Sequence, residues 1–144
     1  MDGKAPVGIE IRTLSNLIMR KTEKIFAGEE DDGITATNGW IIGFLASNPD
    51  REIYQRDLEA QFSITRSTAS KVLLLMEKKG LIERVSVPHD ARLKKLVLTA
   101  KAREIRERRL IKAREFEETL IKGFTEAELE FLYTCIGKMK DNLS

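Results

Sequence analysis

The spacing of apolar residues changes from helical to strand-like just after Gly80, and this change constrains the fold more than any other feature. Before it, apolar residues recur every three or four positions, as on one face of a helix. After it, residues 81–87 alternate between apolar and polar, and residues 93–98 resemble a returning strand. Pro88 to Ala91, between them, are typical of a turn. We therefore expect a two-stranded hairpin that directly follows a helix.

Four helices are expected before this hairpin, and residues that cap or break helices mark several of their ends. They lie at Val7–Phe26, between Thr35 and Asn48, around Leu58 and Phe62, and between Thr65 and Gly80. Ile53-Tyr54 is a short extended piece, and Ser63-Ile64 is a tight connection between the third and fourth helices. The two helices before the hairpin are thus short and close together.

Two more helices are expected after the hairpin. Thr99 caps a long helix that runs to about Lys122, and Gly123 ends it. Thr125 and Glu128 have the spacing of a capping box, which marks the start of the last helix. Four helices, a hairpin and two helices make a mostly α (α+β) fold. With three prolines and 6% aromatic residues, the composition also favours helices over a β-sandwich.

Charge is unevenly distributed along the chain, although the net charge is only +2. Residues 51–114 hold 17 basic and 8 acidic residues, a net charge of +9. Residues 1–50 have a net charge of −3, and residues 115–144 have −4. A basic centre between acidic ends suggests a surface that meets a polyanion, with the ends engaged elsewhere. A solvated basic helix is the simpler interpretation for residues 101–114.

Two short helices joined by a tight turn and followed by a hairpin have the layout of a winged helix-turn-helix. A helix of about 10 Å diameter fits the major groove of DNA, and its first turn reaches base edges. The second helix of the pair opens with small hydroxyl and basic residues that we expect to contact DNA, namely Thr65, Arg66, Ser67, Thr68, Ser70 and Lys71. For Thr65, a plain helix cap is the alternative.

The residues from Leu58 to Thr99 resemble the DNA-binding lobe of the MarR family of bacterial transcriptional regulators. The run Met76–Arg84 fits the family pattern L-E-x-x-G-L-I-x-R, and Asp90–Thr99 fits D-x-R followed by a strand that ends in Leu-Thr. The resemblance implies that Arg92 enters the minor groove at the wing tip and that Asp90 holds its guanidinium group. Lys94, on the same wing, is a further expected DNA contact.

Some positions depart from the family pattern. Leu74 and Leu75 stand where relatives usually carry polar or basic residues, Glu59 replaces a common alanine, and Phe62-Ser63 replaces a corner that usually contains glycine. Leu74 and Leu75 favour an alternative function, a winged-helix module that binds proteins and not DNA. The basic centre of the chain argues against this alternative.

Nothing in the sequence indicates an enzyme, a metal site or a cofactor. His89 is the one histidine, and it suits either a DNA contact or a solvated turn. Cys135 is the one cysteine, which excludes a disulfide within the chain and favours a small buried residue over a redox switch. Glycine-rich nucleotide loops, nucleophile elbows and zinc-protease motifs are absent from the sequence. The acidic cluster Glu29–Asp32 lacks the spacing of a calcium loop.

A small-molecule effector is the remaining partner we consider, because some members of the resembled family bind one. Trp40 and Phe44 lie one helical turn apart and could line its pocket. The alternative is that both belong to the hydrophobic core.

The sequence thus predicts a regulator in three parts. Residues 35–99 form the DNA-binding lobe, and residues 1–34 and 100–144 pair two copies, because both regions carry apolar positions that the lobe cannot cover. We expect a homodimer that binds double-stranded DNA at a pseudo-palindromic operator, and the family resemblance implies repression. No apolar run is long enough to cross a membrane, so we expect a cytoplasmic protein without membrane contact.

Overall fold

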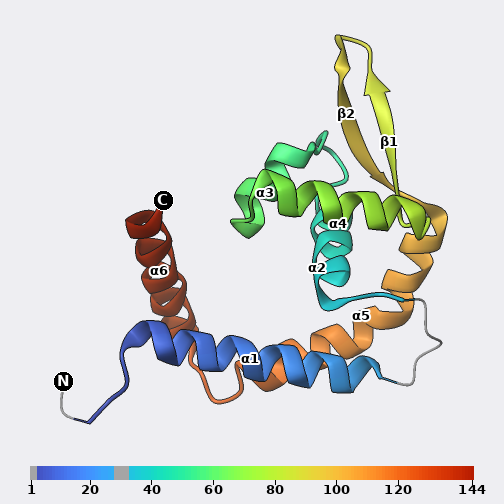
Figure 1. Cartoon of the computed structure of the whole chain (residues 1–144). Coiled ribbons are helices and arrows are strands. Elements are labelled where there is room, and N and C mark those ends of the chain that lie inside the picture. Colours follow the sequence, from blue (N-terminus) through green and yellow to red (C-terminus); the bar gives the residue numbers. More distant parts are fainter. Residues whose placement is uncertain (1–2, 28–32) are drawn as a thin grey trace. The chain divides into compact units, whose positions relative to one another are not determined.

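The structure is a computed structural model that describes residues 3–27 and 33–144. Within these residues, six helices and two strands follow one another in the predicted order (Figure 1). Their bounds are α1 (Val7–Phe26), α2 (Ala36–Ser47), α3 (Gln55–Phe62), α4 (Arg66–Lys78), β1 (Ile82–Val87), β2 (Asp90–Leu98), α5 (Ala100–Leu120) and α6 (Glu126–Leu143). The predicted mostly helical fold with a winged helix-turn-helix is confirmed.

Threonine side chains begin four of the helices, as the sequence indicates. The hydroxyl oxygen of Thr65 accepts a hydrogen bond from the backbone N–H of Thr68 at 3.2 Å, and that of Thr99 accepts from the N–H of Ala102 at 3.1 Å. Thr35 begins α2, and Thr125 begins α6 with its capping box. Each bond satisfies an N–H group that the first helical turn leaves without a backbone partner.

Strand β2 begins closer to the tip of the wing than the sequence suggests. Its turn is Pro88-His89, and β2 already begins at Asp90, so the predicted four-residue turn is wrong. Val87 pairs with Asp90 and the next pair joins residues 86 and 94, which leaves residues 91–93 out of register. Backbone pairing does not require apolar side chains, which explains why a strand can begin at Asp90 without alternation.

One hydrophobic core joins α2, α3, α4, the wing and the start of α5. Ile41, Leu58, Leu73, Met76 and Leu81 are at most 1% exposed. Ala102 and Ile105 belong to the same cluster and come from the first turns of α5. A further strand-like bond links the backbone N–H of Leu96 to the carbonyl oxygen of Ile53 at 2.7 Å. The wing is therefore anchored to the helices at its base.

Two compact units divide the chain, Met1–Leu110 and Ile111–Ser144, and α5 spans the division. In the first unit, α1 has no buried residue, and Val7, Ile9 and Leu17 are more than half exposed. In the second unit, α6 likewise has no buried residue, and Phe131 and Tyr133 are more than two-thirds exposed. These apolar stripes are uncovered in the single chain.

None of the helices in the described ranges is long and apolar enough to cross a bilayer.

Candidate nucleic-acid interface

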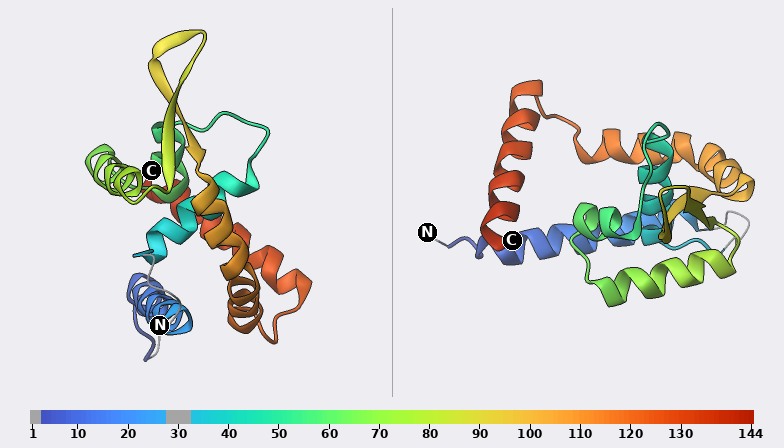
Figure 2. Two further views of the ribbon diagram at one scale, coloured as in Figure 1. Left: turned by 90° about the vertical axis from the view of Figure 1, so that its right-hand side faces the viewer. Right: turned by 90° about the horizontal axis from the view of Figure 1, so that it is seen from above.

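A left-handed residue turns the chain sharply between α3 and α4. Ser63 has φ of 50° and ψ of 46°, and the backbone N–H of Ile64 donates to the carbonyl oxygen of Glu59 at 3.1 Å. Leu58 of α3 and Leu73 of α4 face the common core with no exposed surface. The turn therefore holds the opposite side of α4 toward solvent, next to the wing that rises from its C-terminal end (Figures 1 and 2).

The predicted contact residues of α4 lie on this solvent side, which we call the outer face of α4. Ala69 and Leu73 are buried and Val72 packs against the core, whereas the polar residues beside them are turned outward. The outer face consists of Arg66, Ser67, Thr68, Ser70 and Lys71, all exposed. One surface thus offers two cations and three hydroxyl groups.

Thr65 is engaged in capping α4. Its hydroxyl oxygen accepts from the Thr68 N–H, as described above, and its hydroxyl group donates to the Thr68 side-chain oxygen at 3.0 Å. These two bonds occupy much of the hydrogen-bonding capacity of one hydroxyl. The structure therefore supports the capping role that was the alternative for Thr65, and a DNA contact stays a prediction.

Gln55, the first residue of α3, contacts the outer face and was not singled out from the sequence. Its side-chain nitrogen lies 3.0 Å from the hydroxyl oxygen of Ser70 and 3.4 Å from the backbone carbonyl oxygen of Arg66. No local pattern indicates this contact, because 15 residues separate Gln55 from Ser70. The link between the two helices became visible only with the fold.

At the wing tip, Asp90 contacts the backbone of Arg92. The carboxylate Oδ1 of Asp90 accepts a hydrogen bond from the Arg92 N–H at 2.8 Å. The family resemblance implied a contact with the guanidinium group, and that role stays a prediction. Arg92 and Lys94 are both exposed, and the ammonium group of Lys94 lies 2.5 Å from the hydroxyl oxygen of Ser86. The tip is therefore locally ordered and basic.

Several polar contacts fix the wing base against α4. Gly80 has φ of 73°, a conformation that strains other residues, and its carbonyl oxygen accepts from the Thr99 hydroxyl at 2.6 Å. Lys101 donates to the backbone carbonyl oxygen of Lys79 at 2.8 Å. Glu77 of α4 also forms an ion pair with Arg84 of β1. Helix and wing thus keep a fixed spacing, which a surface that recognises an extended ligand requires.

The interface is suited to binding a polyanion and carries no metal-ligand cluster. Arg66, Lys71 and Arg92 are exposed cations on its two elements. In the part of the chain that the structure describes, no group of three or more His, Cys, Asp or Glu side chains could hold a metal ion. Cations and hydroxyls on a protruding helix and hairpin are the side chains that contact phosphates and base edges.

Comparison with known proteins identifies the fold. The sequence profile of the MarR family matches residues 32–93. The crystal structure of the transcription regulator MarR from Oenococcus oeni PSU-1 is 30% identical to this chain. The match covers 94% of this chain and 99% of that one, with a TM-score of 0.83. This chain belongs to the MarR family.

Other MarR-type proteins are similar over nearly the whole chain. The S. aureus MepR–DNA complex is 25% identical with a TM-score of 0.84, and covers 96% of this chain and 97% of MepR. The HTH-type transcriptional regulator BilQ of Clostridioides difficile (strain CD3) is 22% identical over 135 residues, which are 92% of this chain and 91% of BilQ. Members of the MarR family are transcriptional regulators and not enzymes, as the sequence predicts for this chain.

In this MarR-family protein, Trp40 and Phe44, the two residues predicted to line an effector pocket, have surroundings that differ from each other. The ring of Phe44 packs edge-on against Phe62, with ring centroids 5.9 Å apart, and the guanidinium of Arg51 lies 5.7 Å from the Phe44 centroid. Trp40 is 45% exposed. Phe44 therefore contributes to packing, and a pocket that involves both residues stays a prediction.

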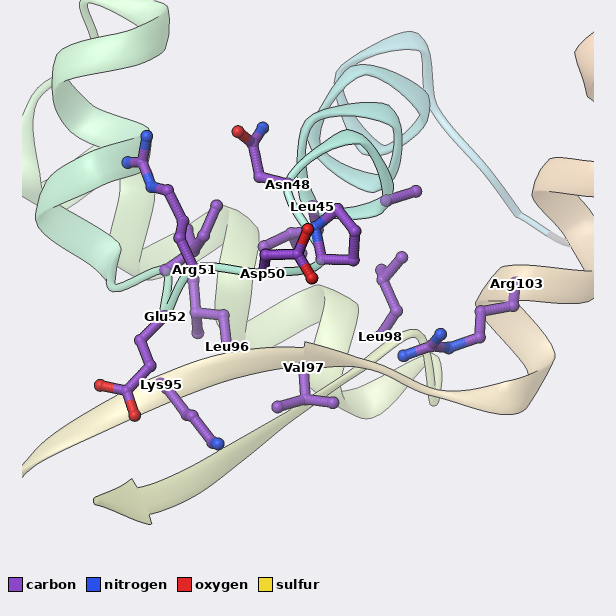
Figure 3. Close-up of a pocket in the computed structure, with 13 residues that line it drawn as sticks. Leu45, Asn48, Asp50, Arg51, Glu52, Lys95, Leu96, Val97, Leu98 and Arg103 are labelled. Carbon is purple, nitrogen blue, oxygen red and sulfur yellow. The ribbon is translucent and has the colours of Figure 1, made fainter. Parts of the chain in front are cut away.

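A groove of about 430 Å³ lies elsewhere, between the loop after α2 and strand β2 (Figure 3). Neither Trp40 nor Phe44 lines it. Its charged side chains have both signs, namely Asp50, Arg51, Glu52, Lys95 and Arg103. Nearby, the hydroxyl of Tyr54 donates to Glu52 at 2.6 Å, and this bond raises the pKa of Tyr54 above its usual value. Mixed charges do not select a ligand of one sign.

The sequence also draws attention to His89, Cys135 and the acidic cluster Glu29–Asp32, none of which belongs to α4. His89 is exposed in the wing turn, where the sequence places it. Cys135 is a free, partly exposed thiol in α6. The acidic cluster Glu29–Asp32 lies outside the described residues.

Proposed function

We propose that this MarR-family regulator binds duplex DNA in a sequence-specific way, as a homodimer on a pseudo-palindromic operator, and that it represses transcription. The observation that carries the proposal is the outer face of α4 beside a basic wing. A helix with exposed cations and hydroxyls next to a projecting hairpin matches the dimensions and chemistry of adjacent DNA grooves.

In this proposal, α4 enters the major groove with its first turns. The guanidinium group of Arg66 can bond two acceptors of guanine at once, and Lys71 neutralises a phosphate. Ser67, Thr68 and Ser70 are small enough to let the helix approach closely and can bond bases or phosphates. Thr65 contributes mainly by capping the helix.

The wing contacts the neighbouring minor groove. Arg92 enters it, because a narrow minor groove has a strong negative potential that attracts arginine. Asp90 fixes the backbone at the tip through its bond to the Arg92 N–H. Lys94 is exposed on the same strand as Arg92 and meets the phosphates.

The apolar residues of α1 and α6 support dimerisation. Ile9, Leu14, Phe131, Tyr133 and Leu143 are each at least 49% exposed in the single chain. Soluble proteins rarely leave so many large apolar side chains in water, and a two-fold contact would cover equivalent surfaces of both copies. Two copies would present two α4 helices about 34 Å apart, one turn of DNA.

Repression follows from occupancy of the operator. A dimer that covers two adjacent major grooves would exclude polymerase from an overlapping promoter. The similar protein MepR of S. aureus forms a complex with DNA, and this relative supports DNA binding here. We further propose that a small-molecule effector, bound near Trp40 and Phe44, adjusts the affinity for DNA.

A protein-binding module is the second candidate, and one observation favours it. Leu74 and Leu75 of α4 are 51% and 53% exposed. Two adjacent leucines in solvent suit an apolar protein surface. They also suit contact with thymine methyl groups in the major groove, which keeps them compatible with DNA binding.

Selection from random DNA duplexes with the full-length protein tests the proposal. We expect enrichment of a motif with two inverted half-sites about 10 base pairs apart, centre to centre. Transcription in vitro from a promoter that overlaps this motif should fall when the protein is added. Recovery of no motif would favour the protein-binding module.

A further inference from the structure

A hydrogen bond between Gln55 of α3 and Ser70 of α4 determines whether the Ser70 hydroxyl group donates or accepts a hydrogen bond toward a ligand. The side-chain nitrogen of Gln55 lies 3.4 Å from the carbonyl oxygen of Arg66 and 3.0 Å from the hydroxyl oxygen of Ser70. A carbonyl oxygen only accepts hydrogen bonds, so the end of the Gln55 amide that faces it must be the NH₂ group. If the amide were turned over, two acceptor oxygens would face each other.

The direction of the bond to Ser70 follows from this orientation. An NH₂ group donates, so the hydroxyl oxygen of Ser70 accepts. A serine in a helix often donates its hydrogen to the carbonyl four residues earlier, which here belongs to Arg66. That oxygen already receives the helical N–H of Ser70 and the NH₂ group of Gln55. The hydroxyl hydrogen of Ser70, an exposed residue, is thereby directed outward.

We infer that Gln55 is a positioning residue that makes Ser70 a hydrogen-bond donor toward DNA bases and so sets part of the sequence specificity. This inference rests on the proposed DNA binding. In the major groove, guanine, adenine and thymine present acceptors, whereas cytosine presents the N4 donor. A hydroxyl whose hydrogen points outward favours a base with an acceptor and disfavours cytosine. A freely rotating hydroxyl would bond either kind of base.

The test compares the DNA motifs that four full-length proteins select from random duplexes. The proteins are the parent, Ser70→Ala, Gln55→Ala and the double variant. We expect Ser70→Ala to lose the preference at one base pair of each half-site. Gln55→Ala should lower the preference over cytosine at that same base pair by roughly 3- to 10-fold, the effect of one hydrogen bond. The double variant should select the same motif as Ser70→Ala.

Variants at Gln61 provide the matched control, because Gln61 is an exposed glutamine at the other end of the same helix. Gln61→Ala should leave the motif unchanged. Gln55→Glu keeps the size of the side chain but removes the donor, so it should weaken the same preference as Gln55→Ala. Gln61→Glu adds the same charge to the same helix and should lower affinity without changing the motif. Thermal unfolding of each protein verifies that it is folded.

The outcomes distinguish failure of this inference from failure of the proposed DNA binding. A parent protein that selects no motif contradicts DNA recognition itself. A parent motif that Ser70→Ala leaves unchanged shows that Ser70 does not contact bases and overturns the inference. A Gln55→Ala motif identical to that of the parent overturns the positioning role. If Gln55→Ala weakens binding to all duplexes equally, Gln55 contacts the phosphate backbone and positions nothing.

Discussion

The ammonium group of Lys79 donates a 3.1 Å hydrogen bond to the side-chain oxygen of Asn38, although 41 residues separate them. Asn38 is 4% exposed and lies in the first turn of α2. Lys79, at the end of α4, also donates to the carbonyl oxygen of Gly33 at 2.7 Å. The start of α2 is thereby tied to the end of α4, close to the base of the wing.

Replacement of Lys79 by methionine should destabilise the first unit. The variant keeps an unbranched side chain but removes both hydrogen bonds, which leaves the buried Asn38 oxygen with the 3.3 Å bond from Thr35. We expect the free energy of unfolding to fall by about 1–2 kcal/mol, near the lower end of the values for hydrogen bonds to charged groups, because the site is partly exposed. Urea denaturation followed by circular dichroism measures it.

Lys78→Met is the matched control, because Lys78 is the exposed last residue of α4 and directly precedes Lys79. Its unfolding free energy should stay within about 0.5 kcal/mol of the parent value. Equal stability of the two variants would mean that the Lys79 contacts contribute nothing in solution.

Removal of the Arg92 side chain should weaken DNA binding without unfolding the protein. Arg92 is exposed, and its backbone N–H, which the substitution retains, makes the contact with Asp90. We expect Arg92→Ala to lose about 1–3 kcal/mol of binding free energy, measured by fluorescence anisotropy on the selected operator. Unchanged affinity would show that the wing tip does not enter a groove.

Two substitutions at Asp90 distinguish its two proposed roles. Asparagine retains the side-chain oxygen that accepts from the Arg92 N–H, whereas alanine removes it. If Asp90 acts on the backbone, Asp90→Asn should bind as tightly as the parent, and Asp90→Ala should bind less tightly, by a smaller factor than Arg92→Ala. Equal weakening by both substitutions would instead favour the contact with the guanidinium group.

Salt should weaken DNA binding steeply. The outer face of α4 and the wing present exposed cations, including Lys71 and Lys94, that would displace counterions from phosphates. We expect log K to fall with log salt at a slope of about −4 to −9 for a dimer. Lys71→Gln should reduce this slope by roughly 2, one contact from each copy. Lys122→Gln, a change at an exposed lysine outside both elements, should leave it unchanged.

Ser63→Gly should stabilise the turn of the helix-turn-helix. Ser63 has φ of 50°, in the left-handed region that glycine adopts without a steric penalty. We expect a gain of about 0.5–1 kcal/mol in unfolding free energy, partly offset by the greater freedom of glycine in the unfolded chain. Ser47→Gly, at the end of α2, should have the opposite sign. A destabilised Ser63→Gly variant would show that the serine side chain contributes to the turn.

The sequence predicts best the features that depend on residues close to one another along the chain. Thr65 and Thr125 cap helices through residues three positions away, so their patterns could be recognised directly. The turn at Ser63 was also expected from the short spacing of two helices. The hairpin was predicted from its alternation, but its tip was not, because Asp90 pairs through backbone atoms that every residue has.

Contacts across the fold were beyond sequence reasoning. Lys79 has the same side chain as Lys78, and nothing in the sequence indicates which of them reaches Asn38. Gln55 looked like an ordinary polar residue at a helix start until α3 placed it beside Ser70. Such contacts depend on how helices pack, and one sequence records this only through the apolar residues that drive packing.

Assembly through the terminal helices can be tested by truncation. The hydrophobic core involves residues 41–105, so a chain that ends after Gly123 keeps every member of it. Removal of α6 also removes exposed apolar residues, among them Phe131 and Leu143. Light scattering at micromolar concentration should give twice the 16.4 kDa chain mass for the full protein and a single-chain mass for the truncated one.

Tight DNA binding should be lost together with pairing. Each recognition helix then binds its half-site separately, without the gain in effective concentration that a linked second copy provides. We expect affinity for a full operator to fall by at least about 100-fold, toward the affinity for a half-site. Circular dichroism must show that the truncated chain stays folded. A folded, monomeric truncated chain that still binds the full operator tightly would show that α6 serves another purpose than pairing two DNA-binding lobes.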